Sequence, residues 1–144
     1  MRNDILEFFN EVNNKRRFFP PEVQIEQFVD KIMRHATIIP VLEEGKISGL
    51  IAFYCNDTTR QKAFITAIAI SENRKIKNLA SFLMKAAIDM AKEMGFQTIE
   101  AEIYKSNPLS LRLADKFGMY PKEDKGNYYI VLRDLTTEPV PPSK

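Results

Sequence analysis

Hydrophobic residues recur every three or four positions in the first quarter of the chain, which is the spacing of one face of an α-helix. The first such segment follows Asn3, a residue that favours the N-cap position, and ends in the basic residues 15–17. The second is predicted to begin at Pro21, directly after Pro20, because proline suits the first helical position. It runs to about Ala36. The spacing therefore predicts two amphipathic helices. Their apolar faces consist of Ile5, Leu6, Phe9 and Val12 in the first helix and Ile25, Phe28, Val29, Ile32 and Met33 in the second.

The repeat changes to that of β-strands after the second helix. Thr37–Glu43 and residues 46–56 are strand-like, and Glu44 and Gly45 between them form a hairpin signal. Lys62–Ile70 is predicted as a third strand because it is rich in Ile, Phe and Thr. The pattern predicts an antiparallel hairpin followed by a further strand.

Helical spacing returns at residues 76–94, and Gly95 suits the position that ends a helix. Residues 97–104 then alternate between apolar and polar side chains, as in a strand with two different faces. One face carries Ile99, Ala101 and Ile103, and the other carries Glu100, Glu102 and Tyr104.

A last helix and two strands are predicted towards the end of the chain. Asn107 and Pro108 are the residue types of an N-cap and a first helical position, and Gly118 suits the end of that helix. Residues 119–122 are consistent with a short strand, and residues 127–135 with a final one.

This order of elements limits the architecture. The strand–helix–strand unit at residues 62–104 is long enough for a right-handed crossover, so its two strands are expected to be parallel neighbours. The preceding hairpin is antiparallel. We therefore expect a mixed central sheet with helices on both faces, which is an α/β or equally an α+β fold. Residues 1–135 are expected to form one domain, and the proline-rich residues 136–144 a disordered tail.

Composition narrows the class of protein. The chain has 144 residues, a net charge of +2 and a single cysteine, Cys55, so it forms no intramolecular disulfide. The charge is too small to argue for a nucleic-acid or membrane partner. No apolar run approaches the roughly 20 residues of a membrane-spanning helix, and the first residues are not those of a signal peptide. We expect a cytoplasmic protein without a metal site, since no residues have metal-ligand spacing.

Two local patterns resemble the GCN5-related N-acetyltransferase (GNAT) superfamily. Residues 68–84 are similar to the family's strand-to-helix segment, whose loop reads Arg/Gln-x-x-Gly-x-Gly/Ala; Lys75, Asn78 and Ala80 fall on the three motif positions. Residues 106–119 resemble the family's Asn-x-x-Ala-x-x-x-Tyr-x-x-x-Gly-Phe helix. The resemblance implies the GNAT-like acyl-CoA N-acyltransferase fold.

The chain departs from both patterns at one important position each. Asn78 stands where the family has its first loop glycine, and Ala114 stands where the family often has a tyrosine. Asparagine is the least costly substitute for glycine where the backbone needs a positive φ. Ala80 keeps the second glycine position small.

The resemblance implies acetyl-CoA as acyl donor and assigns residues to it. The loop and first turn of the helix would hold the pyrophosphate, because a helix start offers unpaired N–H groups and a partial positive charge. This set is Lys75, Ile76, Lys77, Asn78, Leu79, Ala80 and Ser81, with Arg74 as a further cation. The alternative is a solvated basic loop.

The family's strand arrangement adds further donor contacts. In the family the strand that ends at Ile70 splays from its parallel neighbour, so the backbone of Ile68, Ala69 and Ile70 would bind the pantetheine arm and polarise the thioester carbonyl. The alternative is a buried core strand, and both can hold together. Asn107 and Ser110 would reach the cofactor, although Asn107 is equally expected to cap its helix.

Proton transfer needs its own side chains. Glu102 is the first choice of general base, acting through water, and Tyr104 is a proton donor for the leaving thiol in place of the tyrosine missing at Ala114. The alternative for both is a polar strand face at the exposed end of the sheet. His35 and Cys55 are expected to be structural.

The leading hypothesis is an N-acetyltransferase that moves an acetyl group from acetyl-CoA to a primary amine in a ternary complex. The acceptor would be a small metabolite, an amino sugar or a peptide amine. The alternatives are a non-catalytic acyl-CoA-binding sensor or interaction module, and a degenerate fold that only packs against another protein. The apolar stripe of residues 127–135 offers a strand that could pair across a homodimer.

Overall fold

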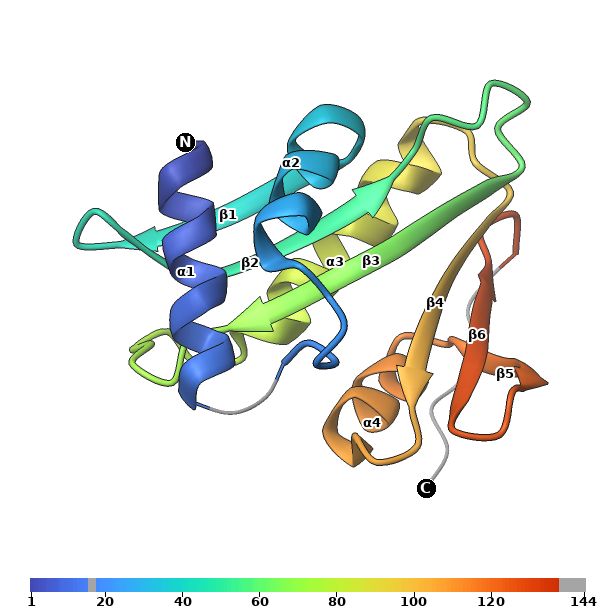
Figure 1. The fold of residues 1–144 in the computed structure, drawn as a ribbon. Helices are drawn as coiled ribbons and strands as arrows, with labels where there is room; N and C mark the ends of the chain where they lie inside the picture. The colour runs from blue at the N-terminus through green and yellow to red at the C-terminus, as the bar shows by residue number, and fades with distance from the viewer. Residues whose placement is uncertain (16–17, 138–144) are drawn as a thin grey trace.

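The computed structural model describes residues 1–15 and 18–137, which form four helices and six strands (Figure 1). The elements are, in chain order, α1 (Arg2–Lys15), α2 (Ile25–His35), β1 (Thr37–Glu43), β2 (Lys46–Tyr54), β3 (Lys62–Ile70), α3 (Leu79–Glu93), β4 (Thr98–Tyr104), α4 (Pro108–Lys116), β5 (Tyr120–Asp124) and β6 (Tyr128–Asp134).

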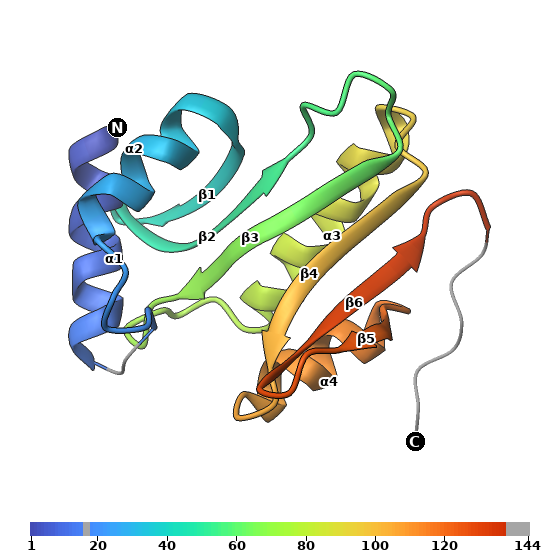
Figure 2. The ribbon, with the colours of Figure 1, turned by 45° about the vertical axis from the view of Figure 1, so that its right-hand side comes forward.

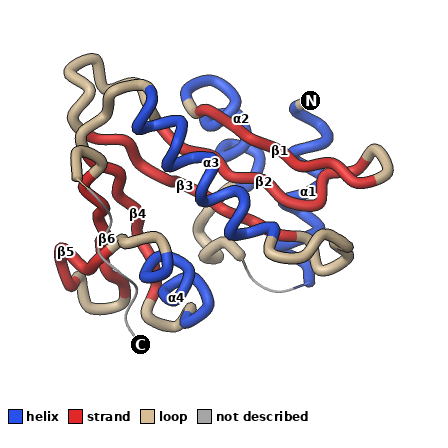
Figure 3. The backbone as a smooth tube through the Cα atoms, turned by 180° about the vertical axis from the view of Figure 1, so that it is seen from behind, coloured by secondary structure: helices blue, strands red, loops and turns tan. Residues whose placement is uncertain are grey.

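All six strands belong to one mixed sheet in the order β1-β2-β3-β4-β6-β5. Only β3 and β4 are parallel, and α3 connects them as the expected crossover. Helices α1 and α2 cover one face over β1, β2 and β3, whereas α3 and α4 lie on the opposite face (Figures 1 and 3). The predicted mixed sheet with helices on both faces is confirmed.

Each face of the sheet has its own apolar core. Beneath α3 and α4, residues such as Phe53, Leu83 and Ile99 are fully buried. Beneath α1 and α2, Ile5, Phe9 and Leu50 are fully buried. The second core is aromatic: the ring centroids of Phe9 and its neighbours Phe18, Phe19 and Phe28 lie 5.4 to 5.9 Å apart.

The two parallel strands pair for only part of their length. Their register runs from Lys62↔Thr98 to Ile65↔Ala101 and ends there. On its other side β3 pairs with β2, and Thr66 is the extra residue of a β-bulge, since Phe53 pairs with Ile65 and Ala52 with Ala67. At their ends the two strands diverge: β3 runs towards the C-terminal end of α1, whereas β4 runs towards α4 (Figure 1).

Several predicted boundaries are wrong for identifiable reasons. Helix α2 begins at Ile25, not at Pro21, because the prolines belong to a turn in which Val23 donates its N–H to Pro20. Helix α3 begins at Leu79 because Asn78 has φ 60, and Ile76 is 41% exposed instead of continuing the buried face. β2 ends at Tyr54, two residues early.

The proposed dimer strand is also wrong. β6 pairs with β4 on one edge and with β5 on the other, so it has no edge left for a second copy (Figure 2). Its apolar stripe was instead the mark of an internal strand. The basic pair Arg16 and Arg17 and residues 138–144 of the expected tail lie outside the described residues.

Candidate functional site

Beyond their last pair, Ile65↔Ala101, β3 and β4 are no longer hydrogen-bonded to each other, and we call the space between them the gap. Some backbone groups of β3 point towards it. Ser71 donates its N–H to the carbonyl oxygen of Ser48 in β2, at 2.8 Å. Because residues two apart along a strand turn the same way, Ala69 also turns its N–H towards β2. Ile68 and Ile70 therefore turn theirs to the other side, into the gap beyond the last β3–β4 pair.

The loop after β3 ends in a left-handed residue that starts α3. Asn78 has φ 60 and ψ 28 and makes no side-chain cap bond, and its carbonyl accepts the first helical bond from Phe82, at 3.0 Å. The expectation that asparagine supplies the positive φ here is confirmed. Leu79, Ala80 and Ser81 are the first helical residues, whose N–H groups have no acceptor within a helix. The start of α3 is therefore an open set of donors.

A pocket of about 550 Å³ opens beside this helix start. It lies between the first turns of α3 and the end of α4, where Lys116 donates from Nζ to Ser81 Oγ at 2.9 Å. Phe82 lines it while remaining 58% exposed. The lining residues are Val41, Ile76, Lys77, Asn78, Leu79, Ser81, Phe82, Lys85, Lys116 and Phe117.

Only some of the predicted loop residues line the pocket. Lys77 lines the pocket, whereas Lys75 and Ala80 do not. Lys75 is engaged elsewhere: its Nζ lies 3.3 Å from Oε1 of Glu44, and Arg74 donates to the Ser71 carbonyl. Of the predicted loop cations, Lys77 lines the pocket, and two helices add Lys116 and Lys85, whose Nζ lies 2.6 Å from Oδ2 of Asp89. Sequence reasoning missed Lys85 as a residue of this pocket.

Glu43, the last residue of β1, also reaches the loop, which sequence reasoning did not anticipate. Both its carboxylate oxygens accept the backbone N–H of Lys75 at 3.1 Å, and Oε2 also accepts a short hydrogen bond from the hydroxyl of Ser48. The hydroxyl of Ser48 and then the loop N–H groups hold the pKa of Glu43 below its usual value. The contact spans 32 residues of sequence, so no local signal could have revealed it.

The start of α4 is closed by its own residues. The side chain of Asn107 accepts the N–H of Ser110 at 3.2 Å, and Pro108 occupies the first turn. The helix-cap interpretation of Asn107 is confirmed. Ala114, at the family's tyrosine position, is 1% exposed and lies in the core beneath α3 and α4. The chain therefore has no proton donor at that position.

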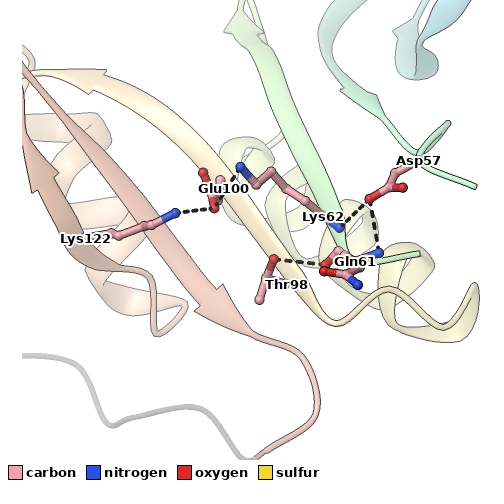
Figure 4. Close-up of polar contacts among 6 residues, drawn as sticks. All are labelled: Asp57, Gln61, Lys62, Thr98, Glu100 and Lys122. Carbon is pink, nitrogen blue, oxygen red and sulfur yellow. Dashed lines mark hydrogen bonds and ion pairs between the residues drawn. The ribbon is translucent and has the colours of Figure 1, made fainter. Parts of the chain in front are cut away.

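The polar face of β4 divides into two different environments. Glu100 is 4% exposed, and its Oε2 lies 3.1 Å from the Nζ of Lys122 and 3.5 Å from that of Lys62 (Figure 4). Glu102 is exposed and is the first residue of this face beyond the last β3–β4 pair. Tyr104 is 49% exposed and stacks edge-on against Tyr128, with ring centroids 5.7 Å apart.

This difference decides which carboxylate is available. The charge of Glu100 is compensated by two lysines, so it holds β3, β4 and β5 together. The start of β3 is further fixed by Asp57, which accepts the N–H of Lys62 at 3.1 Å (Figure 4). Of these two carboxylates, Glu102 is the one exposed to solvent.

His35 and Cys55 lie outside this arrangement of groups. His35 is exposed at the end of α2, and its carbonyl accepts the side chain of Asn56 at 3.2 Å. Burial raises the pKa of the half-buried Cys55 thiol, which disfavours the reactive thiolate. Within residues 1–15 and 18–137, no group of three or more His, Cys, Asp or Glu is placed to hold a metal ion. In that same part of the chain, no helix has the length and apolar character needed to span a bilayer.

Comparison with known proteins identifies the family of this chain. Residues 2–119 match the family model described as the acetyltransferase (GNAT) family. A Bacillus subtilis (strain 168) protein, whose name describes a [ribosomal protein bS18]-alanine N-acetyltransferase, is 33% identical over 95 residues. That match covers 66% of this chain and 61% of the relative, so the chain spans about three fifths of the relative's length.

Solved structures share the fold at low identity. The PaiA N-acetyltransferase of Thermoplasma acidophilum, in complex with coenzyme A, has a TM-score of 0.75 at 13% identity, with 92% of each chain covered. YncA of Salmonella typhimurium, with its cofactor acetyl-CoA, has a TM-score of 0.71 at 17% identity, covering 100% of this chain and 95% of its own. By its fold and by the match over most of its length, the chain belongs to the acetyltransferase (GNAT) family.

Proposed function

We propose that the protein transfers the acetyl group of acetyl-CoA to a primary amine by direct attack in a ternary complex. The observation that carries the proposal is the junction of a strand gap with an open helix start. β3 and β4 separate after Ile65↔Ala101, and α3 begins beside them with an uncapped first turn. Membership of an acetyltransferase family supports this reading of the gap.

The open helix start fits the diphosphate of coenzyme A. The N–H groups of Leu79, Ala80 and Ser81 and about half a positive charge from the helix dipole favour an anion at this point. Lys77 adds a full charge on the loop side. The pocket beside them, with exposed Phe82 and the cations of Lys85 and Lys116, has the chemistry to hold the nucleotide part.

Acetyl-CoA supplies an activated acyl group as a thioester with a good leaving group. The backbone of Ile68, Ala69 and Ile70 forms one wall of the gap that would receive its pantetheine arm. An N–H of Ile68 or Ile70 would stabilise the negative charge that develops on the carbonyl oxygen, an effect of about 3 kcal/mol for one such donor. Asn107 and Ser110 stand at the end of the opposite wall.

Glu102 is the proposed general base. A primary amine must lose its proton before it attacks, and near neutral pH this costs about 4 to 5 kcal/mol for an ordinary alkylammonium. Glu102 is exposed at the gap and can accept that proton directly or through a water. The lysine-paired Glu100 is a poorer candidate because its charge is already compensated.

Tyr104 is the proposed proton donor to the departing sulfur. Its ring is partly fixed by Tyr128, and it lies on the same strand face as Glu102. A thiol has a pKa near 8.5 and leaves fairly well as the thiolate. The loss of a tyrosine at Ala114 therefore slows the reaction without preventing it.

The acceptor is tested with a panel of amines. The panel includes small metabolites, amino sugars and peptides with a free α-amine, the last because the Bacillus subtilis relative is named for a protein alanine. We expect at least one of them to release coenzyme A thiol from acetyl-CoA. A protein that is stabilised by acetyl-CoA but releases no thiol with any amine would instead be an acyl-CoA sensor, which the buried Ala114 favours.

Donor binding is tested separately by thermal unfolding. Acetyl-CoA at 100 times its dissociation constant should add about 2.7 kcal/mol to the free energy of unfolding. An unchanged melting temperature at millimolar acetyl-CoA would exclude both the enzyme and the sensor.

A further inference from the structure

The carboxylate of Glu43 accepts hydrogen bonds from the loop that resembles the family's pyrophosphate-binding loop. Its oxygens lie 3.1 Å from the backbone nitrogen of Lys75, and the N–H of Ile76 also lowers the pKa of this carboxyl group. Ser48, only 5% exposed, holds the carboxylate from the other side. The amides of Lys75 and Ile76 therefore already face an anion, and this anion belongs to the protein.

The hairpin of β1 and β2 fixes the loop at three points. Ser48 accepts the N–H of Ser71 at the loop's beginning, and Glu43 accepts that of Lys75 in its middle. At its end, Leu79 packs so closely on Gly49 that a Cβ there would lie 2.9 Å from Leu79 Cδ2. The hairpin thus restrains a loop that contains no glycine, from the end of β3 to the first residue of α3.

Charge repulsion makes a carboxylate unfavourable beside the proposed diphosphate site. A negative charge beside a diphosphate site repels the ligand, so its removal should strengthen binding if charge were its only effect. A hydrogen bond to a charged group holds the backbone more firmly than a neutral one does. If the Glu43 carboxylate orients the loop, removing the carboxylate should weaken coenzyme A binding. The two roles predict opposite signs.

We propose that Glu43 is a positioning residue for the acyl donor: it fixes the turn from Lys75 to Asn78 and leaves the diphosphate to the N–H groups of Leu79, Ala80 and Ser81. The inference rests on the proposed function. It also narrows the donor contacts expected from sequence, because the backbone of Lys75 is assigned to Glu43 and not to the ligand.

The test compares Glu43→Ala, Glu43→Gln and Glu44→Gln. Glu44 is the matched control, because within the described part of the chain its carboxylate contacts the Nζ of Lys75 and no backbone N–H of the loop. Binding of coenzyme A is measured by calorimetry, and binding of pantetheine, which lacks the nucleotide diphosphate, by backbone amide NMR shifts. Glu43→Ala should raise the Kd of coenzyme A about tenfold. Glu43→Gln should lose less, because its amide oxygen still accepts the N–H of Lys75.

The measurement with pantetheine distinguishes a loss of loop positioning from general damage to the fold. The Kd of pantetheine should be unchanged in all three variants, and Glu44→Gln should bind coenzyme A as well as the wild-type protein or slightly better. Unchanged or tighter coenzyme A binding in Glu43→Ala would overturn the inference, as would an equal loss of pantetheine binding. If the wild-type protein binds no coenzyme A, it is the proposed function that fails.

Discussion

The helices α3 and α4 each follow one of the two parallel strands, yet their first turns are built in opposite ways. At α4, Asn107 caps the N–H of Ser110 and Pro108 brings no N–H of its own. At α3, Asn78 is left-handed and caps nothing. The sequence of α4 satisfies its own helix start, whereas that of α3 leaves donors for something else.

The surroundings of the two helix starts reinforce this contrast. A pocket with Lys77, Lys85 and Lys116 opens beside α3. The strand that leads to α4 instead carries the exposed Glu102 and Tyr104. An unfilled cap forgoes about 1 kcal/mol of stability, which is consistent with a site kept for a ligand. The proposed function divides accordingly, with donor binding on the β3–α3 side and the proton chemistry on the β4–α4 side.

The largest expected effect tests the chemical side. Glu102→Gln should lower kcat about a thousandfold with the best acceptor of the amine panel, because the amine loses its base. The Kd of coenzyme A should stay the same, since Glu102 is not part of the donor pocket. Steady-state thiol release and calorimetry measure the two quantities. Glu123→Gln, which removes another exposed carboxylate of the same sheet, serves as the control. A kcat within threefold of wild type in Glu102→Gln would remove this residue from the mechanism.

A smaller effect is expected on the binding side. Lys77→Glu combined with Lys116→Glu should raise the Kd of coenzyme A about a hundredfold, because two cations of the pocket become anions. Lys75→Glu should change it much less, because Lys75 lies outside the pocket lining. Calorimetry on folded protein, checked by circular dichroism, gives both values. Equal losses in the two proteins would mean that the diphosphate contacts the whole basic loop.

A matched pair of asparagines compares the two helix starts directly. Asn78→Asp keeps a residue type that tolerates positive φ but places a negative charge at the open turn, so the Kd of coenzyme A should rise about tenfold. Asn107→Asp keeps a good N-cap and favours the helix dipole, so it should leave the fold intact and change coenzyme A binding less. The contrast between the two helices fails if both substitutions weaken binding equally.

The smallest expected effect concerns stability. Asn107→Ala removes the cap of α4 and should lower the free energy of unfolding by about 1 kcal/mol in urea titrations. Asn107→Ser, which can still cap, should recover most of this loss. If coenzyme A binding falls tenfold in the serine variant while stability is retained, Asn107 contacts the donor as well as its own helix.

The sequence predicted those features that depend on neighbouring residues. The hairpin at Glu44 and Gly45, the bounds of β3 and the Asn107 cap all follow from local residue types and are present in the structure. The family resemblance pointed to the loop before α3. The start of that helix was misplaced because the apolar spacing continues through Ile76, and spacing alone does not report a left-handed residue at Asn78.

Contacts between distant segments could not be predicted in the same way. Alternation along β4 shows that Glu100 and Glu102 share a face, but it does not show that Lys62 and Lys122 converge on only one of them. Pairing partners have the same limitation: β6 has the apolar stripe of a strand, and only the sheet order shows that both its edges are occupied. The contact of Glu43 with the loop depends on how a hairpin folds over a later segment.

The extra residue at Thr66 imposes a constraint on the length of β3. Before it, Ile65 faces the α3 side; after it, the count of odd and even positions reverses, so that Ala67 belongs to the opposite core. A chain shortened by one residue here would have to exchange the two faces of one half of the strand, so that its side chains entered the wrong core. Substitutions in this segment are therefore easier to accommodate than deletions. Relatives in which the two parallel strands also separate should keep the number of residues in β3, even where the side chains differ.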